Sequence, residues 1–292
     1  MQGYPLIFGE VLFDCFEDGS RVLGGAPFNV AWNLQALGAE PLFVSRVGDD
    51  APGRLVRDRM QHWGMGAAGV QLDTTHPTGS VEVGIRDGEP AYEIVTGRAW
   101  EHIEPSSLPS LDVALIYHGS LALRSATNAV ALERLVASHP APLFVDVNLR
   151  PPWWQTDALH AMLDRATFAK LNEQEVDALG GNGAHVCDRA EALLVRHRLD
   201  LLFVTRGPEG AFALGRHGDS ASIAPGKGIQ VVDTVGAGDA FASVVLLGLV
   251  RGWSWPLILE RAQQLAGAVV GLRGAISDDD NFYEPFRKQW ES

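Results

Sequence analysis

Leu111-Asp-Val-Ala-Leu-Ile-Tyr117 is the first of a series of short apolar runs that decides the fold. Three more runs follow along the chain, at Pro142–Val147, Phe168–Leu171 and Leu201–Val204, and helix-like stretches separate them. This alternation is typical of βαβ units, in which the strands pair in parallel. The sequence therefore predicts an α/β fold with a mostly parallel central sheet.

Each of these runs ends in small or polar residues. The carboxyl ends of parallel strands lie along one edge of an open sheet, where ligands bind. We therefore expect the residues that follow the four runs to face one crevice. They are His118, Gly119 and Ser120, then Asn148 and Arg150, then Asn172, and finally Thr205, Arg206 and Gly207.

The region from Pro77 to Trp100 has a different pattern. Residues 80–86 and 91–95 alternate between apolar and polar side chains on either side of Asp87-Gly88, which predicts a β-hairpin. An earlier pair of runs at residues 12–16 and 21–23 surrounds a second turn. The two pairs predict a small β lid, formed by about residues 12–24 and 77–101, within a single domain that spans residues 1–292.

Composition excludes several classes of protein. A chain of 292 residues that is 46% hydrophobic is long enough for one large core. Its net charge of -13 works against nucleic acid or an anionic membrane surface as a partner. Cys15 and Cys187 lie far apart, so neither a disulfide framework nor a zinc site is indicated. With no leader and no long apolar window, we expect a cytoplasmic protein.

The strongest chemical signal is residues 230–241, Gln-Val-Val-Asp-Thr-Val-Gly-Ala-Gly-Asp-Ala-Phe. It predicts a β-branched strand, a Gly-X-Gly turn and an apolar helix that ends at Gly252. The first N–H groups of a helix have no partner within it, so this end suits the charge of a transferring phosphoryl group. Asp239 is then placed to accept the proton of an attacking hydroxyl. The competing interpretation is an Asp that only favours the helix dipole.

The longer string from Asp233 to Phe241 closely resembles the C-terminal signature of the PfkB-type, ribokinase-like carbohydrate kinases, and the pattern is most similar to that of bacterial fructokinases. The resemblance implies a Rossmann-type three-layer α/β/α sandwich with a small β lid. It also implies an ATP-dependent sugar kinase that uses Mg²⁺, with Asp239 as the base and the backbone of Gly236, Ala237 and Gly238 as the anion hole. A monovalent cation such as K⁺ is implied next to that hole, with Asp233, Val235, Val269 and Gly274 as its candidate ligands.

A second resemblance lies near the N-terminus, in the segment from Gly24 to Gly38. Its composition predicts a helix, because Pro27 suits the first helical position and Gly38 the position after the end. Asn33 fits an ordinary packed helix. The family resemblance implies that Gly24, Gly25 and Asn29 contact sugar hydroxyls and that Asp14 is the early sugar-binding Asp.

Two segments resemble the nucleotide-binding elements of the family. Asn172-Glu-Gln-Glu175 is similar to an Asn-x-x-Glu element near the nucleotide and its magnesium, and it is equally a helix capping box. Thr205-Arg-Gly-Pro-Glu-Gly210 resembles the Thr-x-Gly-x-x-Gly loop, although a plain turn also explains it. The implied nucleotide contacts are Lys170, Asn172, Glu175, Thr205, Arg206, Gly207, Gly210 and Gln263.

The segment Asp146-Val-Asn-Leu-Arg150, followed by two Trp residues, is similar to one in fructokinases and in 2-keto-3-deoxygluconate kinases. A guanidinium at Arg150 binds either a carboxylate or neutral hydroxyls, or it is a surface arginine paired with an Asp. Glu93 in the lid would repel an anion, which favours fructose as the substrate and fructose 6-phosphate as the product. The alternatives are a 2-keto-3-deoxygluconate kinase, a ribose or nucleoside kinase, and a catalytically silent sugar-sensing relative. The acceptor-site candidates are Asp14, Gly24, Gly25, Asn29, Tyr92, His118, Asn148 and Arg150, although His118 also suits strand-end packing.

Three further patterns bear on the interpretation. Residues 64–69 satisfy Gly-x-Gly-x-x-Gly, but they follow a helix-like stretch and precede a strand, the reverse of the dinucleotide-binding context. Arg206 and Gln263 depart from the family pattern, which affects the expected adenine pocket. A lid face with Val81, Val83, Ile85 and Ile94, expected to be exposed, predicts a homodimer.

Overall fold

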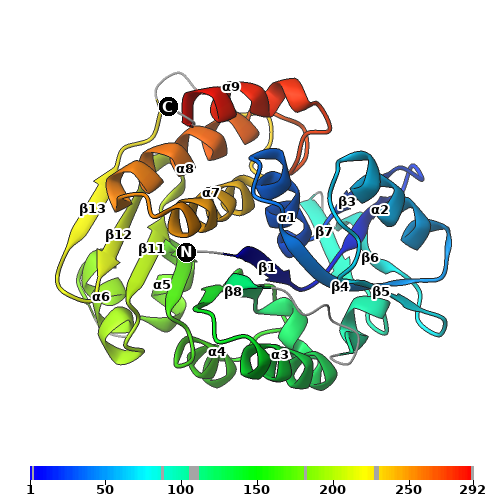
Figure 1. The fold of residues 1–292 in the computed structure, drawn as a ribbon, viewed down its shortest axis with the longest axis horizontal. Helices are drawn as coiled ribbons and strands as arrows, with labels where there is room; N and C mark the ends of the chain where they lie inside the picture. The colour runs from blue at the N-terminus through cyan, green and yellow to red at the C-terminus, as the bar shows by residue number, and fades with distance from the viewer. Residues whose placement is uncertain (2, 87–88, 105–111, 181–182, 227–229, 291–292) are drawn as a thin grey trace.

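The computed structural model describes residues 1, 3–86, 89–104, 112–180, 183–226 and 230–290. Within these residues a nine-stranded sheet runs through the centre of the molecule, and a smaller four-stranded sheet stands at one side (Figure 1). The order of the large sheet is β13-β12-β11-β10-β9-β8-β1-β4-β5, and that of the small sheet is β3-β2-β6-β7.

The strands of the large sheet are β1 (Tyr4–Phe8), β4 (Leu42–Gly48), β5 (Val70–Asp73), β8 (Val113–Gly119), β9 (Leu143–Asp146), β10 (Phe168–Asn172), β11 (Leu201–Thr205), β12 (Ala211–Gly215) and β13 (Ser220–Ile223). All neighbours from β11 to β5 pair in parallel, and β12 and β13 extend the sheet antiparallel. The four apolar runs thus form β8, β9, β10 and β11, side by side, as the sequence predicts; Leu111 lies outside the described residues.

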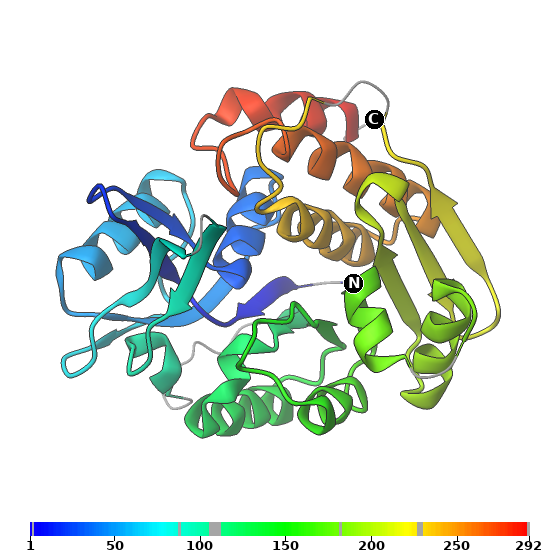
Figure 2. The same cartoon turned by 180° about the vertical axis from the view of Figure 1, so that it is seen from behind.

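The helices are α1 (Ala26–Ala36), α2 (Ala51–His62), α3 (Ala126–Ser138), α4 (Thr156–Leu163), α5 (Glu173–Leu179), α6 (Val186–Arg196), α7 (Ala237–Arg251), α8 (Trp255–Val269) and α9 (Asp280–Trp290). Short 3₁₀ helices are η1 (Ala99–His102), η3 (Leu121–Arg124) and η4 (Gly207–Glu209). In Figure 2 the group α7, α8 and α9 lies on one side of the sheet, and α3 and α4 lie on the other.

Two hydrophobic cores explain why the strands read as continuous apolar runs. In β11, Phe203 belongs to the core beneath α1, α7 and α8, whereas Leu202 and Val204 belong to the core beneath α3 to α6. In β9, Phe144 and Val145 divide in the same way. A strand that is buried on both faces has no polar positions to alternate with. The result is the three-layer α/β/α sandwich.

The sheet changes direction of winding at β1. This strand pairs with β4 on one side and with β8 on the other, and both pairings are parallel. Helix α1 precedes β4 on one face, and α3 connects β8 to β9 on the opposite face. Such a switch point opens a crevice at the carboxyl ends of the strands. The segments that follow β1, β8 and β9 therefore meet there.

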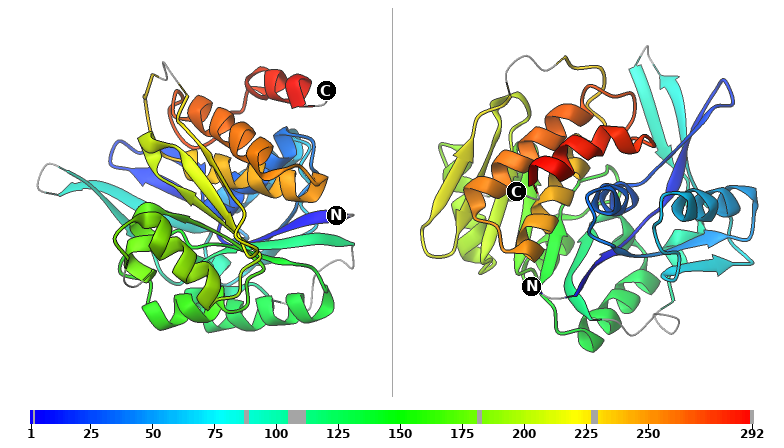
Figure 3. Two further views of the ribbon diagram at one scale, coloured as in Figure 1. Left: turned by 90° about the vertical axis from the view of Figure 1, so that its left-hand side faces the viewer. Right: turned by 45° about the horizontal axis from the view of Figure 1, so that its top comes forward.

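The small sheet contains β2 (Leu12–Phe16), β3 (Arg21–Gly24), β6 (Gly79–Arg86) and β7 (Glu89–Ile94), and Figure 3 shows it projecting from the body beside α1 and α2. The hairpin of β6 and β7 is antiparallel, as predicted, while its turn at Asp87-Gly88 lies outside the described residues. Val81 is buried, and Val83 and Ile94 are half-buried, so the prediction of an exposed hairpin face is wrong at these three positions. Nothing is described for the Ile85 side chain.

One predicted strand is absent. Val231 and Val232 precede the Gly-X-Gly turn in an irregular segment, with side chains 63% and 58% exposed. The backbone N–H groups of Val232 and Asp233 donate to the carbonyl of Val270 in the loop after α8, rather than to a neighbouring strand. The β-branched composition therefore misled the prediction, since β propensity depends on a partner strand. Within the described residues, no helix combines the length and apolarity needed to cross a bilayer.

Candidate active site

The floor of the crevice is a buried ion pair between the ends of β9 and β10. Nζ of Lys170 lies 3.0 and 3.1 Å from the two carboxylate oxygens of Asp146, and the two side chains are 6% and 0% exposed. Burial opposes the charge on Lys170, but the carboxylates of Asp146 and Glu175 outweigh it and raise the pKa of the ammonium group. A charged pair of this kind stays buried because each partner compensates the other.

The N-terminus of α7 lies directly above this pair. Gly236 caps the helix with φ +80°, and a Cβ there would lie 2.3 Å from the Cα of Ala275, so both the conformation and the close approach require glycine. A Cβ on Gly238 would lie 3.3 Å from Nζ of Lys170. The predicted helix, including its end at Gly252, is confirmed, and its first turn faces a fixed positive charge.

Asp239 in the first turn of α7 is held by α1. The amide Nδ2 of Asn29 donates to Oδ2 of Asp239 at 2.8 Å. Asn29 lies in the first turn of α1, four residues after the helix cap Gly25. Burial raises the pKa of Asp239 to about 6, while the Asn29 hydrogen bond acts in the opposite direction. Oδ1 of Asn29 is buried without a hydrogen-bond partner among the described residues. Unpaired acceptors of this kind suit a ligand that donates from hydroxyl groups.

The loop after β9 carries Arg150 to the mouth of the crevice. Asn148 has φ +43°, and the N–H of Leu149 donates to Oε1 of Glu175 at 2.8 Å, which fixes the loop to α5. Arg150 itself is exposed, and its Nη1 donates to the carbonyl of Leu149. Its charge lowers the pKa of Asp14 and of Asp239, although burial dominates and raises both. Two predicted carboxyl groups from separate parts of the chain, Asp14 and Asp239, thus lie within the influence of the Arg150 charge.

The capping box predicted at Asn172 and Glu175 is present. Oδ1 of Asn172 accepts from the N–H of Glu175, and Oε2 of Glu175 accepts from the N–H of Asn172. Because Oε1 of Glu175 also binds the Leu149 N–H, both carboxylate oxygens accept a backbone hydrogen bond. Capping is therefore observed, while the role near the nucleotide stays a prediction.

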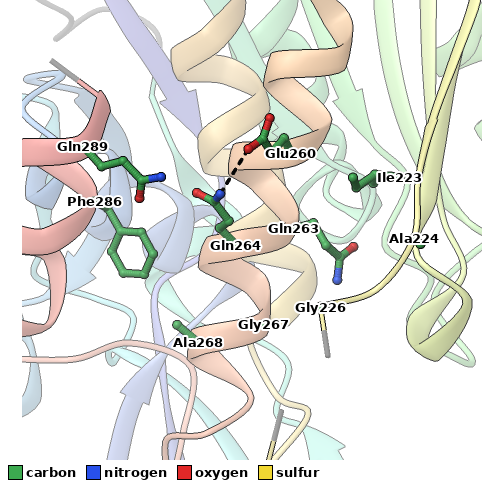
Figure 4. Close-up of a pocket in the computed structure, with 10 residues that line it drawn as sticks. All are labelled: Ile223, Ala224, Gly226, Glu260, Gln263, Gln264, Gly267, Ala268, Phe286 and Gln289. Atoms are coloured by element: carbon green, nitrogen blue, oxygen red, sulfur yellow. Dashed lines mark hydrogen bonds between the residues drawn. The ribbon is translucent and has the colours of Figure 1, made fainter. Parts of the chain in front are cut away.

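A pocket of about 470 Å³ opens between β13, α8 and α9, and Gln263 points into it from α8 (Figure 4). The turn at Thr205–Gly210 leads to this pocket, because Gly210 at φ +88° packs so closely that a Cβ would lie 2.1 Å from the carbonyl oxygen of Ile223. Gly207, with φ +50°, opens η4 in the same turn. The pocket is lined by Ile223, Ala224, Gly226, Glu260, Gln263, Gln264, Gly267, Ala268, Phe286 and Gln289.

Two predicted residues, His118 and Arg206, have contacts within the fold that explain them without a ligand. His118 is 1% exposed, burial lowers the pKa of its imidazole to about 4, and Nδ1 contacts the Gly119 carbonyl, which fits packing at the strand end. Arg206 forms an ion pair with Glu209 and lies over the ring of Phe212.

In the lid, the argument made from Glu93 is wrong. The register pairs Glu93 with Glu82 and Glu82 with Cys15, on the face opposite to the one that carries Asp14. Tyr92 shares the face of Asp14 and is 61% exposed.

Three site residues were missed in the sequence analysis. Asp146 was quoted only as part of a motif, and its pairing with Lys170 depends on the parallel register of β9 and β10. Arg124 in η3 is held between the rings of Trp100 and Trp153, with its guanidinium carbon 4.7 and 4.2 Å from their centres. Glu10 follows β1 at the switch point and is 3% exposed. Glu10 could have been identified in the sequence as a polar residue directly after a strand, but β1 was not among the predicted strands.

Of the residues proposed for a monovalent cation, Asp233, Val235 and Gly274 lie in two neighbouring loops, and Val269 is the last residue of α8. Oδ1 of Asp233 accepts from the N–H of Val235, and Oδ2 accepts from the N–H of Gly274 at 3.2 Å. The carbonyl of Val269 accepts from the N–H of Leu272 at the end of α8. Asp233, Val235 and Gly274 thus lie close together, and their role as cation ligands stays a prediction. Backbone carbonyls and a carboxylate in such a loop are the oxygen ligands that hard cations take.

A model of the pfkB family carbohydrate kinases matches residues 15–281. The chain belongs to the PfkB family. It is 33% identical over 265 residues to a fructokinase of Klebsiella pneumoniae, with 85% of each chain covered. It is 30% identical over 302 residues to a fructokinase of Escherichia coli, with 93% of this chain and 94% of the relative covered.

Solved structures share the fold of this PfkB kinase. A fructokinase of Xylella fastidiosa with bound ATP superposes with a TM-score of 0.83 at 21% identity and covers 99% of both chains. An aminoimidazole riboside kinase of Salmonella enterica, complexed with aminoimidazole riboside and an ATP analogue, superposes with a TM-score of 0.82 at 24% identity, over 97% of this chain and 99% of the other. The protein is an ATP-dependent sugar kinase with the ribokinase-like fold.

The buried pair at the floor of the crevice yields a test of stability. Lys170→Met leaves the carboxylate of Asp146 buried without a countercharge, which we expect to cost about 3–5 kcal/mol of unfolding free energy in urea titrations. The double variant Asp146→Leu/Lys170→Met removes both charges and should recover most of this loss. Glu133→Gln, which breaks the exposed pair with Arg165, is the control and should cost under about 1 kcal/mol. Equal losses in the buried and exposed variants would show that the pair does not organise the floor.

Proposed function

We propose that this kinase phosphorylates fructose, transferring the γ-phosphoryl group of Mg-ATP to the 6-hydroxyl with Asp239 as the general base. One observation carries the proposal: a buried carboxyl group with a pKa of about 6 lies in the first turn of a helix whose glycine-formed N-terminus faces Lys170. A base whose pKa lies near the working pH is ionised and still takes up a proton as the reaction proceeds.

In the proposed step the acceptor oxygen bonds to the γ-phosphorus while the bond from that phosphorus to the bridging β,γ-oxygen breaks. The hydroxyl proton passes to Asp239, and the leaving oxygen carries its electron pair away on ADP. Asn29 holds Asp239 through Oδ2 and leaves the other carboxylate oxygen for the acceptor. Positioning of this kind, rather than covalent chemistry, supplies most of the rate in phosphoryl transfer.

The proposed anion hole is made of backbone N–H groups at the start of α7. The N–H of Ala237 makes only a long contact of 3.4 Å to the Thr234 carbonyl, and the N–H of Ala240 is the first in this turn to bond back to Gly236. The N–H groups of Gly236, Ala237 and Gly238 are therefore the donors that we assign to the transferring phosphoryl oxygens. Lys170 adds a positive charge below the same turn.

On the nucleotide side, we assign the adenine to the pocket beside Gln263 and the phosphates to the path from Thr205 to Gly210. The described residues contain no group of three or more acidic, His or Cys side chains that could hold a metal. Kinases usually bind Mg²⁺ through water and phosphate oxygens, and Asn172 and Glu175 are the residues that we assign to its surroundings. When bound, Mg²⁺ neutralises charge on the phosphates.

The charge of the site does not decide between the candidate acceptors. Fructose is favoured because the relatives named above, at about 30% identity, are fructokinases. Arg150 suits either a carboxylate or hydroxyls. The unpartnered oxygen of Asn29 suits hydroxyl donors and supports a neutral sugar. Asp14, Gly24, Gly25 and Asn148 complete the proposed acceptor site. A 2-keto-3-deoxygluconate kinase is the second candidate, supported by the exposed guanidinium of Arg150.

The small sheet is proposed to act as a lid and as a dimer surface. Three of its apolar side chains are well exposed, namely Phe16 at 38%, Val22 at 44% and Tyr92 at 61%. They lie on the face of Asp14, and an exposed apolar sheet face is a common site of pairing between copies.

The role of Asp239 is tested by Asp239→Asn. The variant should fold normally and lose about 10²–10⁴-fold in kcat, because a positioned base contributes that much.

In the unsubstituted enzyme, kcat/KM should rise with pH through about 6 as the carboxyl group of Asp239 ionises, and then level off. Asp157→Asn is the matched control, since Asp157 also lies in the first turn of a helix, α4. A variant Asp239→Asn that kept most of its kcat would leave the dipole interpretation standing.

The acceptor is tested in a coupled ADP-release assay with fructose, ribose, 2-keto-3-deoxygluconate, glucose and adenosine. We expect the largest kcat/KM with fructose and a requirement for Mg²⁺. Replacing Na⁺ with K⁺ at constant ionic strength should raise the rate if the loops at Asp233 and Gly274 bind a monovalent cation. Preference for the keto-acid would reassign the substrate to the second candidate, and an equal rate in both salts would remove the cation.

The dimer is tested by light scattering with size-exclusion chromatography. Tyr92→Glu places a charge in the exposed face of the lid and should convert a dimer of about twice the 31.5 kDa chain mass into a monomer. Val195→Glu, at an exposed position of α6 with 67% accessibility, is the control and should leave the mass unchanged. A monomeric unsubstituted protein at working concentration would refute the dimer.

A further inference from the structure

Trp153 belongs to the turn that carries Arg150, and its ring packs on a side chain from another element of the fold. The N–H of Trp153 donates to the carbonyl of Arg150 at 2.8 Å, which closes the turn. The Trp153 ring lies over the guanidinium group of Arg124, with 4.2 Å between the ring centre and the guanidinium carbon. The proposed reaction gives this contact no role.

Arg124 is the last residue of η3, and its guanidinium group lies between two Trp rings. The second ring is that of Trp100 in η1, which is fully buried and 4.7 Å from the guanidinium carbon. Nε of Arg124 donates to Oε1 of Glu101 at 3.2 Å, and Nη2 lies 3.1 Å from the same oxygen. The Arg124 side chain is 7% exposed, so one carboxylate and two ring faces, rather than water, stabilise its charge.

The edge of the Arg124 guanidinium group has fewer partners than its faces. Nη1 and Nη2 are buried with no hydrogen-bond partner among the described residues. Hydrogen bonds that a buried group leaves unmade cost free energy. The flat faces suit aromatic rings, because the delocalised cation of Arg is weakly hydrated and stacks on them. Each Trp ring therefore helps to hold the guanidinium group, and the guanidinium group holds each ring.

Buried hydrogen bonds fix the elements that carry Arg124. Asn128 of α3 is 0% exposed, and its Nδ2 donates to the carbonyls of Trp100 and Ala122 at 2.8 and 3.0 Å. Oδ1 of Asn128 accepts from the N–H of Ile103 at 2.9 Å. These three bonds join η1, η3 and α3. The stack thus connects a fixed part of the body to Trp153, whose side chain is 38% exposed.

The turn that carries Arg150 is attached to the body on both sides of this residue. On one side the N–H of Leu149 donates to Oε1 of Glu175 at 2.8 Å. On the other side the ring of Trp153 lies on Arg124. The guanidinium group of Arg150 donates to the carbonyl of its own neighbour, Leu149, and the side chain is exposed. The position of this side chain therefore depends on the backbone that carries it.

We propose that Arg124 is a positioning residue, which holds the Arg150 turn at the acceptor site through its stack with Trp153. Arg124 acts through Trp153 and takes no part in the transfer of the proton. The inference rests on the proposed placement of Arg150 in the acceptor site, and it does not depend on which sugar is the acceptor.

Hydrogen exchange of the turn is the first test, and it needs no substrate. Arg124→Met removes the cation and leaves the sequence of the turn intact. We expect the amides of residues 149 and 153 to exchange about tenfold faster, because a looser turn opens their bonds to Glu175 and Arg150 more often. Exchange in β10, which lies outside the turn, should not change.

The matched control is a second Arg between two Trp rings. The guanidinium carbon of Arg261 in α8 lies 4.1 Å from the ring centre of Trp253 and 5.7 Å from that of Trp290. Arg261→Met removes the same kind of stack from another part of the fold. It should leave exchange at residues 149 and 153 unchanged.

Steady-state kinetics with the best acceptor of the sugar panel is the second test. Trp153→Leu should raise KM for the acceptor about tenfold and leave kcat and KM for ATP within about threefold, because a displaced guanidinium group weakens binding rather than chemistry. Trp153→Phe keeps a ring over Arg124 and should keep KM for the acceptor within about threefold. In an Arg150→Met background, Trp153→Leu should have no further effect, since both substitutions act through one group.

The two tests separate this inference from the proposed function. Unchanged exchange in Arg124→Met, or additive losses from Trp153→Leu and Arg150→Met, would overturn the positioning role. If Arg124→Met fails to fold, Trp153→Leu at its exposed position gives the exchange measurement in its place. An unchanged KM in Arg150→Met would remove Arg150 from the acceptor site, whereas faster exchange in Arg124→Met would still assign the support of the turn to the stack.

Discussion

The buried pair of Lys170 and Asp146 is the interaction on which the rest of the site depends. It joins the carboxyl ends of two central parallel strands, and it places a positive charge beneath the first turn of α7. The helix N-terminus adds the partial positive charge of its unpaired N–H groups. In the proposed reaction the phosphate meets these few groups, although the formal charge of the whole protein is -13.

Around this floor the site is dominated by carboxyl groups rather than by cations. Glu10, Asp14 and Asp239 all have raised pKa values, and in each case burial is the largest cause. Such a cluster is costly in the empty protein, and Oε2 of Glu10 is buried with no hydrogen-bond partner among the described residues. In the proposed acceptor site, a polyhydroxylated sugar would supply donors to these oxygens. Its binding would then offset part of the cost that the empty protein carries.

The sequence predicted the fold well because burial leaves a strong mark on parallel strands. The runs at β9, β10 and β11 are apolar on both faces, and their order along the chain is their order in the sheet. The glycines around Asp239 and the helix after them are equally local features. Prediction failed where a residue's place depends on register or on distant partners. Val231 has no strand to pair with, Glu93 faces away from Asp14, and Glu10 becomes central only once β1 lies between β4 and β8.

The junction of β3 and α1 has a mechanical consequence. The lid strand ends at Gly24 and the helix begins at Ala26, so a single residue, Gly25, separates the small sheet from the turn that carries Asn29. A tilt of the small sheet would therefore move this turn directly. The hydrogen bond from Asn29 opposes the effect of burial on the pKa of Asp239, so such a tilt would also change how strongly Asp239 holds a proton. If the small sheet closes over the acceptor as proposed, closure and deprotonation would be linked through one short stretch of backbone.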